Sequence, residues 1–173
     1  MEASWRSLLG AIESDMLIGY GTSAAKTQAI TNDVTTVLTK RLPGPDVTPE
    51  QLRNRSWWGG PEVYVLVDDY DLVTSGSTNP LAGFLEFLPQ ARDVGLHLIV
   101  VRRSGGAGRA MYEPILMRLR ELATPGMVMS GSKDEGALIG SVKPQPLPPG
   151  RGWLVTRKEG VRLVQLAWLP PKH

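Results

Sequence analysis

The fold is decided by residues 63–71, which read Val63-Tyr64-Val65-Leu66-Val67-Asp68-Asp69-Tyr70-Asp71. Five consecutive strand-forming residues run directly into acidic ones. An apolar run without polar alternation predicts a strand that is covered on both faces, as in the parallel sheets of α/β proteins. The acids that follow have two interpretations. They cap the next turn, or they bind a ligand at the carboxyl end of the strand, where open α/β sheets place their sites.

Length and composition predict one soluble domain with a packed core. The chain has 173 residues, of which 42% are hydrophobic and 21% are charged. The absence of cysteine excludes disulfides and thiolate metal sites, and two histidines argue against a histidine-based metal site or triad. No apolar run reaches transmembrane length, and no signal peptide opens the chain. We therefore expect a soluble segment from a reducing compartment.

Two helices are predicted before this strand. The first spans about 24–41 behind a cap at Thr22 or Ser23, with an apolar stripe at helical spacing. The second starts at Thr48-Pro49-Glu50-Gln51, which combines a cap, a proline at the first helical position and a capping-box glutamine. Trp57 and Trp58 close it, and they either pack internally or face a partner.

A strand–helix–strand unit is predicted over 62–101, of a size that suits a parallel crossover. Its helix starts at Asn79-Pro80, and its second strand is 96–101. The helix buries four apolar side chains, those of Leu81, Phe84, Leu85 and Leu88.

Residues 102–109, Arg102-Arg103-Ser104-Gly105-Gly106-Ala107-Gly108-Arg109, follow the second strand. Glycines before a helix can cradle a phosphate, but the spacing and lysine of a Walker A loop are missing. We therefore interpret the glycines as a flexible strand-to-helix hinge. A helix to about 122, a third parallel strand at 127–129, a short helix at 133–139 and a proline-rich segment follow. A β-hairpin, 152–156 with 161–168, ends the chain.

This order of features resembles the additional-strand P-loop ATPases of the FtsK/SpoIIIE type. Within them it is most similar to the C-terminal ATPase module of the EccC family, the motors of mycobacterial type VII (ESX) secretion. The resemblance covers essentially the whole chain and is carried by residues 65–73, 91–98 and 147–152. It implies a RecA-like parallel sheet flanked by helices, with a C-terminal β-hairpin, in a single partial domain over 1–173.

The resemblance also implies roles for individual residues. Asp68 and Asp69 stand at the Walker B position and are the candidate catalytic residues. Asp68 would hold Mg²⁺ through water, and Asp69 would take the place of the residue that orients the attacking water. The family usually has glutamate in place of Asp69. Aspartate is shorter, and a misplacement of about 1 Å can cost on the order of a hundredfold in rate. The polar end of the sensor strand is matched by Arg102, Arg103 and Ser104. By the resemblance, these residues would bind the nucleotide. Candidates for an arginine finger are Arg109, Arg118, Arg120 and Arg151.

No Walker A loop precedes Asp68, although the resemblance places one there. Ser7-Leu8-Leu9-Gly10 resembles the part just after the second strand of the module, so the first strand and the P-loop are expected to be missing. ATP and Mg²⁺ are therefore expected of the intact module and not of this chain alone. Three explanations stay open: a fragment, a late start, or a strand supplied by another chain.

The resemblance implies a module of a protein secretion motor with weak or no ATP hydrolysis by itself. It would bind small helical WXG-type substrates and assemble with other EccC modules, as a homo-oligomer, at the inner face of the cell membrane. Contact with the membrane would come only through other subunits. One alternative is a hydrolase completed by a partner chain. A DNA-translocating FtsK-like module is another, but a net charge of +2 does not predict nucleic acid. The chain has more apolar residues than its sheet and helices need, and these are candidates for lining a substrate groove: Trp57, Trp58, Leu147, Trp153 and Trp168.

Overall fold

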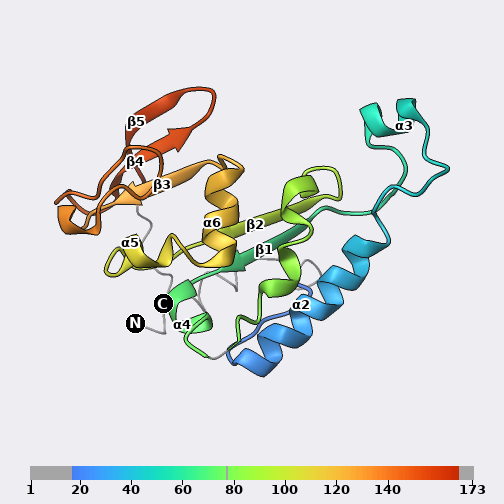
Figure 1. The fold of residues 1–173 in the computed structure, drawn as a ribbon, viewed down its shortest axis with the longest axis horizontal. Coiled ribbons are helices and arrows are strands. Elements are labelled where there is room, and N and C mark those ends of the chain that lie inside the picture. The colour runs from blue at the N-terminus through green and yellow to red at the C-terminus, as the bar shows by residue number, and fades with distance from the viewer. Residues whose placement is uncertain (1–16, 77, 168–173) are drawn as a thin grey trace.

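The computed structural model describes residues 17–76 and 78–167, whose arrangement is shown in Figure 1. The segments Ser7–Gly10 and Trp168, which entered the sequence predictions, lie outside these ranges. In the described part, two strands form a parallel sheet and three others form an antiparallel sheet. The elements are α2 (Ala24–Thr39), α3 (Pro49–Asn54), β1 (Val63–Val67), α4 (Tyr70–Val73), η1 (Ala82–Phe84), η2 (Leu88–Gln90), β2 (Leu96–Val100), α5 (Ala107–Ala110), α6 (Pro114–Glu121), β3 (Gly126–Met129), η3 (Lys133–Glu135), β4 (Arg151–Thr156) and β5 (Gly160–Gln165).

The first two helices begin where their caps predict. The Ser23 hydroxyl accepts a hydrogen bond from the amide of Lys26, and α2 then buries Val34 and Leu38 against the core. Thr48 and Gln51 form the predicted reciprocal capping box of α3. Helix α3 buries no residue of its own and lies on an arm that projects from the body (Figure 1). Local signals therefore placed both helix starts, while only α2 is held by the core.

Strands β1 and β2 pair in parallel, with Val63 opposite Leu96 and Val67 opposite Val100, as predicted. The side chains of one sheet face join α2, η1 and α6 in the main hydrophobic core. The prediction of a strand covered on both faces is wrong for the described residues. Tyr64 and Leu66 point to the other face and are 59% and 67% exposed. The physical reason is that the covering elements of the described part all pack on one side of this sheet.

The crossover between β1 and β2 is not the predicted α-helix. It contains two short 3₁₀ turns, in which the amide of Phe84 donates to the carbonyl of Leu81 and that of Phe87 to Phe84. A 3₁₀-helix has three residues per turn, so Leu81, Phe84 and Phe87 fall on one side and are all buried. The predicted buried residues were therefore correct in the main, while Leu85 is only partly buried.

The helix predicted up to residue 122 is broken into α5 and α6. Pro114 has no amide hydrogen and occupies the first turn of α6, so the chain must restart there. The helix predicted at 133–139 is also shorter. It is the 3₁₀ turn η3, which ends at Gly136 with a φ of 73°.

The third strand is the main correction to the predicted fold. Residues 126–129 form β3, which pairs antiparallel with β4 and lies in a different sheet from β1 and β2. The C-terminal hairpin is confirmed as β4 and β5, in the order β3-β4-β5. A short apolar run predicts a strand but carries no information on its partner, because pairing depends on distant residues. The architecture is thus mixed α/β, with a small parallel sheet and a three-stranded antiparallel sheet.

Candidate functional site

Parallel pairing brings the predicted site residues to one edge of the β1–β2 sheet. The amide of Val101 donates to the carbonyl of Val67 at 2.8 Å, and the amide of Tyr70 donates to the carbonyl of Val101 at 2.9 Å. These bonds extend the register past both strand ends. Asp68 and Asp69 therefore lie beside residues 101–104, at the edge where ligands bind in open α/β sheets.

The two acids after β1 differ in their surroundings. Asp68 is half-buried, and burial raises the pKa of its carboxyl, with repulsion from Asp69 and Asp71 adding to the rise. Asp69 is exposed and adopts a left-handed conformation with a φ of 45° at the N-cap of α4. Its side chain makes no capping hydrogen bond. Asp69 therefore occupies the capping position without performing the capping role that one interpretation gave it.

Sequence reasoning missed the ion pair between Asp71 and Arg103. Both Nε and Nη2 of Arg103 donate to Oδ2 of Asp71, with Nε at 2.9 Å. The Asp71 side chain is 18% exposed and that of Arg103 is 68% exposed. Burial alone would raise the pKa of Asp71, but the bonds from Arg103 outweigh it and lower that pKa. Counting outward from the ends of two paired strands would have placed these residues together.

The other two predicted sensor residues make contacts within their own loop and toward β3. Arg102 donates from Nε to the carbonyl of Arg103 at 3.0 Å and from Nη2 to the carbonyl of Gly105 at 3.1 Å. The hydroxyl of Ser104 donates to the carbonyl of Ser130 at 3.1 Å. Of the three residues, only Arg103 reaches an acid that follows β1.

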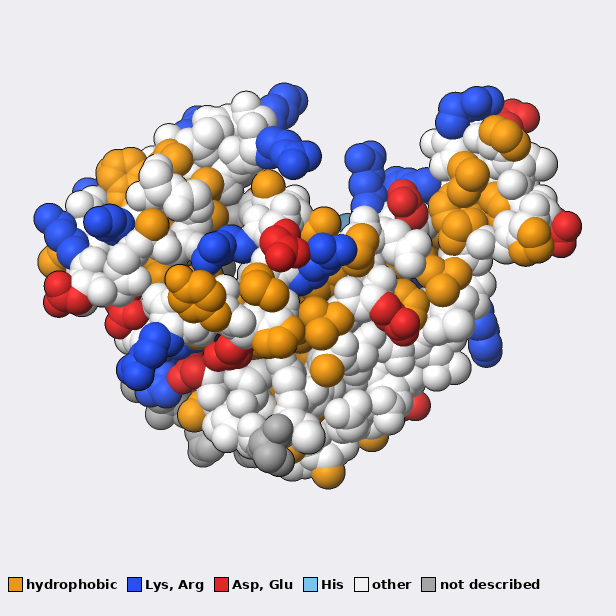
Figure 2. Space-filling model, in the orientation of Figure 1, with side chains coloured by type: hydrophobic (Ala, Val, Ile, Leu, Met, Phe, Trp, Pro, Cys, Tyr) orange, Lys and Arg blue, Asp and Glu red, His pale blue; other side chains and the backbone are white. Residues whose placement is uncertain are grey.

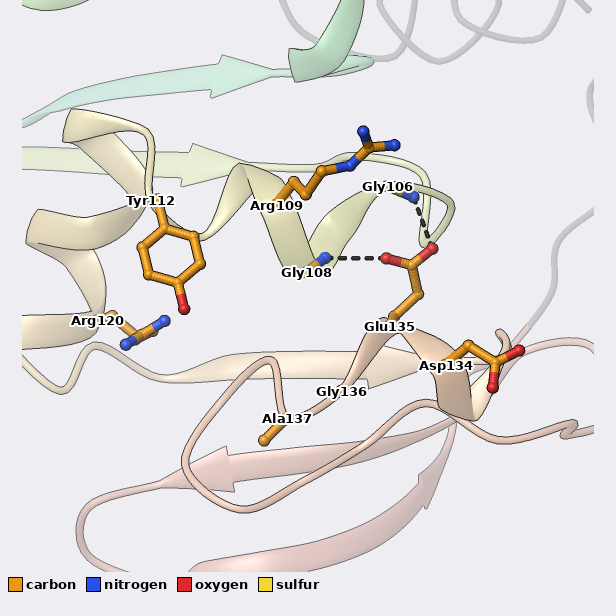
Figure 3. Close-up of a pocket in the computed structure, with 9 residues that line it drawn as sticks. All are labelled: Gly106, Gly108, Arg109, Tyr112, Arg120, Asp134, Glu135, Gly136 and Ala137. Carbon is orange, nitrogen blue, oxygen red and sulfur yellow. Dashed lines mark hydrogen bonds between the residues drawn. The ribbon is translucent and has the colours of Figure 1, made fainter.

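The glycine-rich loop binds a carboxylate of this chain, which sequence reasoning also missed. Glu135 accepts hydrogen bonds from the amides of Gly106 and Gly108, at 2.7 and 2.9 Å (Figure 3). These bonds lower the pKa of Glu135. The loop and η3 border a hollow of about 480 Å³, into which α6 contributes Arg120. The glycines join β2 to α5, as the hinge interpretation has it, and two of their amides are in addition bound by an acidic side chain.

The described acids at the sheet edge are suited to a magnesium ion only through water. Carboxylate oxygens are the ligands that Mg²⁺ prefers, and it usually keeps several waters. Among the residues that the structure describes, no three histidine, cysteine or acidic side chains converge closely enough to hold a metal directly. Asp68 supplies one half-buried carboxyl group at this edge, with Asp69 and Asp71 close enough to raise its pKa.

The paired tryptophans are half-buried, and each makes a hydrogen bond within the chain. The indole Nε1 of Trp57 donates to the carbonyl of Arg41, and that of Trp58 donates to the carbonyl of Asp93, both at 2.7 Å. The Arg41 guanidinium lies 4.3 Å from the centroid of the Trp58 ring. Both indole rings thus fasten the base of the α3 arm. The other groove candidates that the structure describes, Leu147 and Trp153, are half-buried.

Comparison with known proteins identifies the class of protein. No protein-family model matches the chain. The EccC protein of the ESX secretion system of Thermomonospora curvata is 54% identical over 163 residues, which are 94% of this chain and 12% of that protein. The ESX-4 protein EccC4 of Mycobacterium tuberculosis is 56% identical over 165 residues, which are 95% of this chain and 13% of that protein. The chain thus spans about an eighth of the length of these relatives.

The comparison of structures points to the same proteins as the comparison of sequences. A structure of Thermomonospora curvata EccC, ATPases 2 and 3, in complex with a signal sequence peptide superposes with a TM-score of 0.89 and 53% identity, over 95% of this chain and 30% of that one. The cytoplasmic domain of the type VII secretion ATPase EccC from the same organism gives 0.84 and 55%, over 88% of this chain and 18% of that one. The fold matches part of these type VII secretion ATPase structures. In sequence and in structure, the chain matches a segment of EccC.

Proposed function

We propose that this chain is the part of an EccC-type secretion ATPase that receives the signal sequence of a secreted protein. One observation carries the proposal: the match over 95% of the chain to an EccC structure that contains a signal sequence peptide. The two backbones superpose with a TM-score of 0.89 at 53% identity. We further propose that residues 1–173 act as one module of such a motor, assembled with other modules.

The surface of the chain offers apolar anchors for a peptide. Strand β5 exposes Val161 and Leu163 on one face of the antiparallel sheet, each at 47%. Met129 is 41% exposed and lies on the opposite face. A helical peptide binds through a few apolar anchors, and an interface of standard size buries about 800 Å² on each side. Acidic and basic side chains are interspersed over the face shown in Figure 2, without a continuous basic stripe. That face suits an apolar peptide better than the DNA backbone.

The test is a fluorescence-polarisation titration of a labelled signal peptide against this chain and against an intact EccC-type polypeptide that carries it. We expect saturable binding that is lost when the apolar anchors of the peptide are changed to alanine. Leu163→Ser tests the antiparallel sheet, and Leu66→Ser on the parallel sheet is its matched control. Equal affinity for the alanine peptide would exclude an apolar signal site. No binding at high micromolar protein would exclude the receptor role.

The nucleotide chemistry is proposed for the intact polypeptide. Bound Mg²⁺ would neutralise the charge that develops on the transferred phosphoryl group. Asp68 would hold its water ligands, and Asp69 would orient the attacking water. Arg102 and Arg103 would reach the phosphates. This sequence contains no Walker A loop, whose amides and lysine supply most phosphate contacts. Calorimetry of the 173-residue chain with ATP and Mg²⁺ should therefore give no measurable heat of binding, and micromolar affinity would contradict this expectation.

The cellular location is proposed by analogy. One of the matched structures is described as the cytoplasmic domain of EccC. Across residues 17–76 and 78–167, no helix has the length and apolar character needed to cross a bilayer. We propose that the segment works on the cytoplasmic side of a secretion complex, and that other subunits provide the membrane attachment. Fractionation of cells that express the tagged intact polypeptide would test this.

A further inference from the structure

The loop after β2 is fastened to the segment after β3 at two places. Glu135 accepts from the amides of Gly106 and Gly108, and Ser104 donates to the carbonyl of Ser130. Hydrogen bonds to a charged acceptor are roughly twice as strong as neutral ones. Two converging amides therefore define the direction from which the carboxylate must approach.

Close backbone packing leaves this contact little freedom. A Cβ atom on Gly108 would lie 2.3 Å from the carbonyl oxygen of Glu135, and one on Gly131 would lie 2.8 Å from Cβ of Ser104. Only glycine permits both approaches. Ala107 also packs with Val128 and Leu138 in a small second core. The loop thus packs closely between the edge of the β1–β2 sheet and the segment after β3.

A single peptide unit connects Glu135 to Arg102. The amide of Gly106 donates to the carboxylate of Glu135, while the carbonyl of the same peptide, which belongs to Gly105, accepts from Nη2 of Arg102. A peptide that bridges an anion and a cation is polarised by both, so the two hydrogen bonds strengthen each other. The orientation of this peptide plane therefore fixes where the Arg102 guanidinium can lie.

We propose that Glu135 is a positioning residue that acts through the Gly105–Gly106 peptide to hold the Arg102 guanidinium at the carboxyl end of β2. The contact of Arg102 with nucleotide rests on the proposed function, whereas the link from Glu135 to Arg102 does not. Glu135 lies more than thirty residues from Arg102 in the sequence and is not among the residues that the family resemblance assigned. The glycines serve this link rather than a phosphate.

The test is an NMR titration of the 173-residue chain with acid. The charged groups that face Glu135 are Arg102 and Arg109, and Asp134 and Arg120 border the same hollow. Protonating Glu135 weakens both amide bonds. We expect the amide signals of Gly106 and Gly108 and the Nε–H signal of Arg102 to move together, with one midpoint below the ordinary value of glutamate. Glycine signals that titrate while Arg102 stays still would overturn the proposal, and this measurement needs no variant.

Substitutions distinguish the proposed link between Glu135 and Arg102 from simple packing of the loop. Glu135→Gln should abolish the shared acid step, and Asp134→Asn, a change to the adjacent acid, should preserve it. Arg102→Gln should raise the midpoint of the glycine signals, because a positive charge that favours the carboxylate is removed. A shared step that survives Glu135→Gln, or a midpoint unchanged by Arg102→Gln, would refute the link. None of these readouts depends on nucleotide or signal peptide, so failure of the proposed function would be seen separately.

Discussion

At the scale of single residues, one close contact between distant segments joins Gly95 to Trp58. Gly95 is buried, has a φ of 70°, and precedes β2 directly. A Cβ atom there would lie 2.5 Å from Cη2 of Trp58. Arg41 covers the same indole ring and donates to the carbonyls of Val94 and Pro61. Glycine is therefore required by both its backbone conformation and its neighbour.

Gly95→Ala should destabilise the chain. Overpacking typically costs about 1–3 kcal/mol, and the left-handed conformation adds strain for a residue with a Cβ atom. Chemical denaturation monitored by tryptophan fluorescence measures the change in the free energy of unfolding. Gly59→Ala is the matched control, since nothing lies within 4 Å of its Cβ position. It should change stability by less than about 0.5 kcal/mol. Equal effects of the two substitutions would contradict this account.

The ion pair of Asp71 and Arg103 makes stability depend on pH. Because Arg103 lowers the pKa of Asp71 in the folded chain, the ionised carboxylate favours folding above the ordinary pKa of aspartate. That contribution is lost as the pH falls through the lowered folded pKa. Asp71→Asn should thus melt earlier than the native chain at neutral pH, and the gap should close below roughly pH 4.

The effect of Asp71→Asn should be modest, because the Arg103 side chain is 68% exposed and solvent screens the pair. Glu86→Gln, which changes an exposed acid elsewhere, serves as the control and should not reproduce the pH dependence. A gap in melting temperature that stays constant from neutral pH into acid would show that Asp71 acts by packing alone.

At the scale of elements, local signals predicted where segments begin, and distant contacts decided what they became. Ser23, the Thr48 capping box and the apolar run of β1 are readable from a few neighbouring residues. The 3₁₀ turns and the antiparallel pairing of β3 are not, since both depend on partners far along the chain. The same holds at the site: parallel strands predicted the edge with Asp68 and Arg103, whereas Glu135 approaches from another layer.

Two helix caps of the same chemistry should differ in their effect on the whole chain. Thr48→Ala removes the cap of α3, which buries no residue, while Ser23→Ala removes that of α2, which belongs to the core. Each loss costs about 0.5–2 kcal/mol of helix stability. We expect faster amide exchange within 51–54 for Thr48→Ala with an unchanged melting temperature, and a lowered melting temperature for Ser23→Ala. A global loss from Thr48→Ala would show that the arm and the core unfold together.

At the scale of the whole molecule, the parallel sheet is the part with the least support. Within residues 17–76 and 78–167, β2 pairs only with β1, and β3 pairs only with β4. A two-stranded sheet is only marginally stable by itself, and an open strand edge can pair with another chain. The outer face of this sheet also exposes Tyr64, Leu66 and Ile99 to solvent. Both features favour contact between copies.

We therefore expect the 173-residue chain to self-associate reversibly at tens of micromolar, with an average mass in sedimentation velocity that rises with concentration. The double substitution Leu66→Ser with Ile99→Ser should reduce the association with little loss of stability, because these side chains are 67% and 46% exposed. Leu72→Ser is the control: Leu72 is 59% exposed but belongs to α4 and not to a strand of the sheet, so the association should persist. A monodisperse monomer that melts reversibly in two states would mean that the edge and the face are already protected. If the association persisted in the double variant but was lost in Leu72→Ser, the contact would be formed by α4 and not by the sheet.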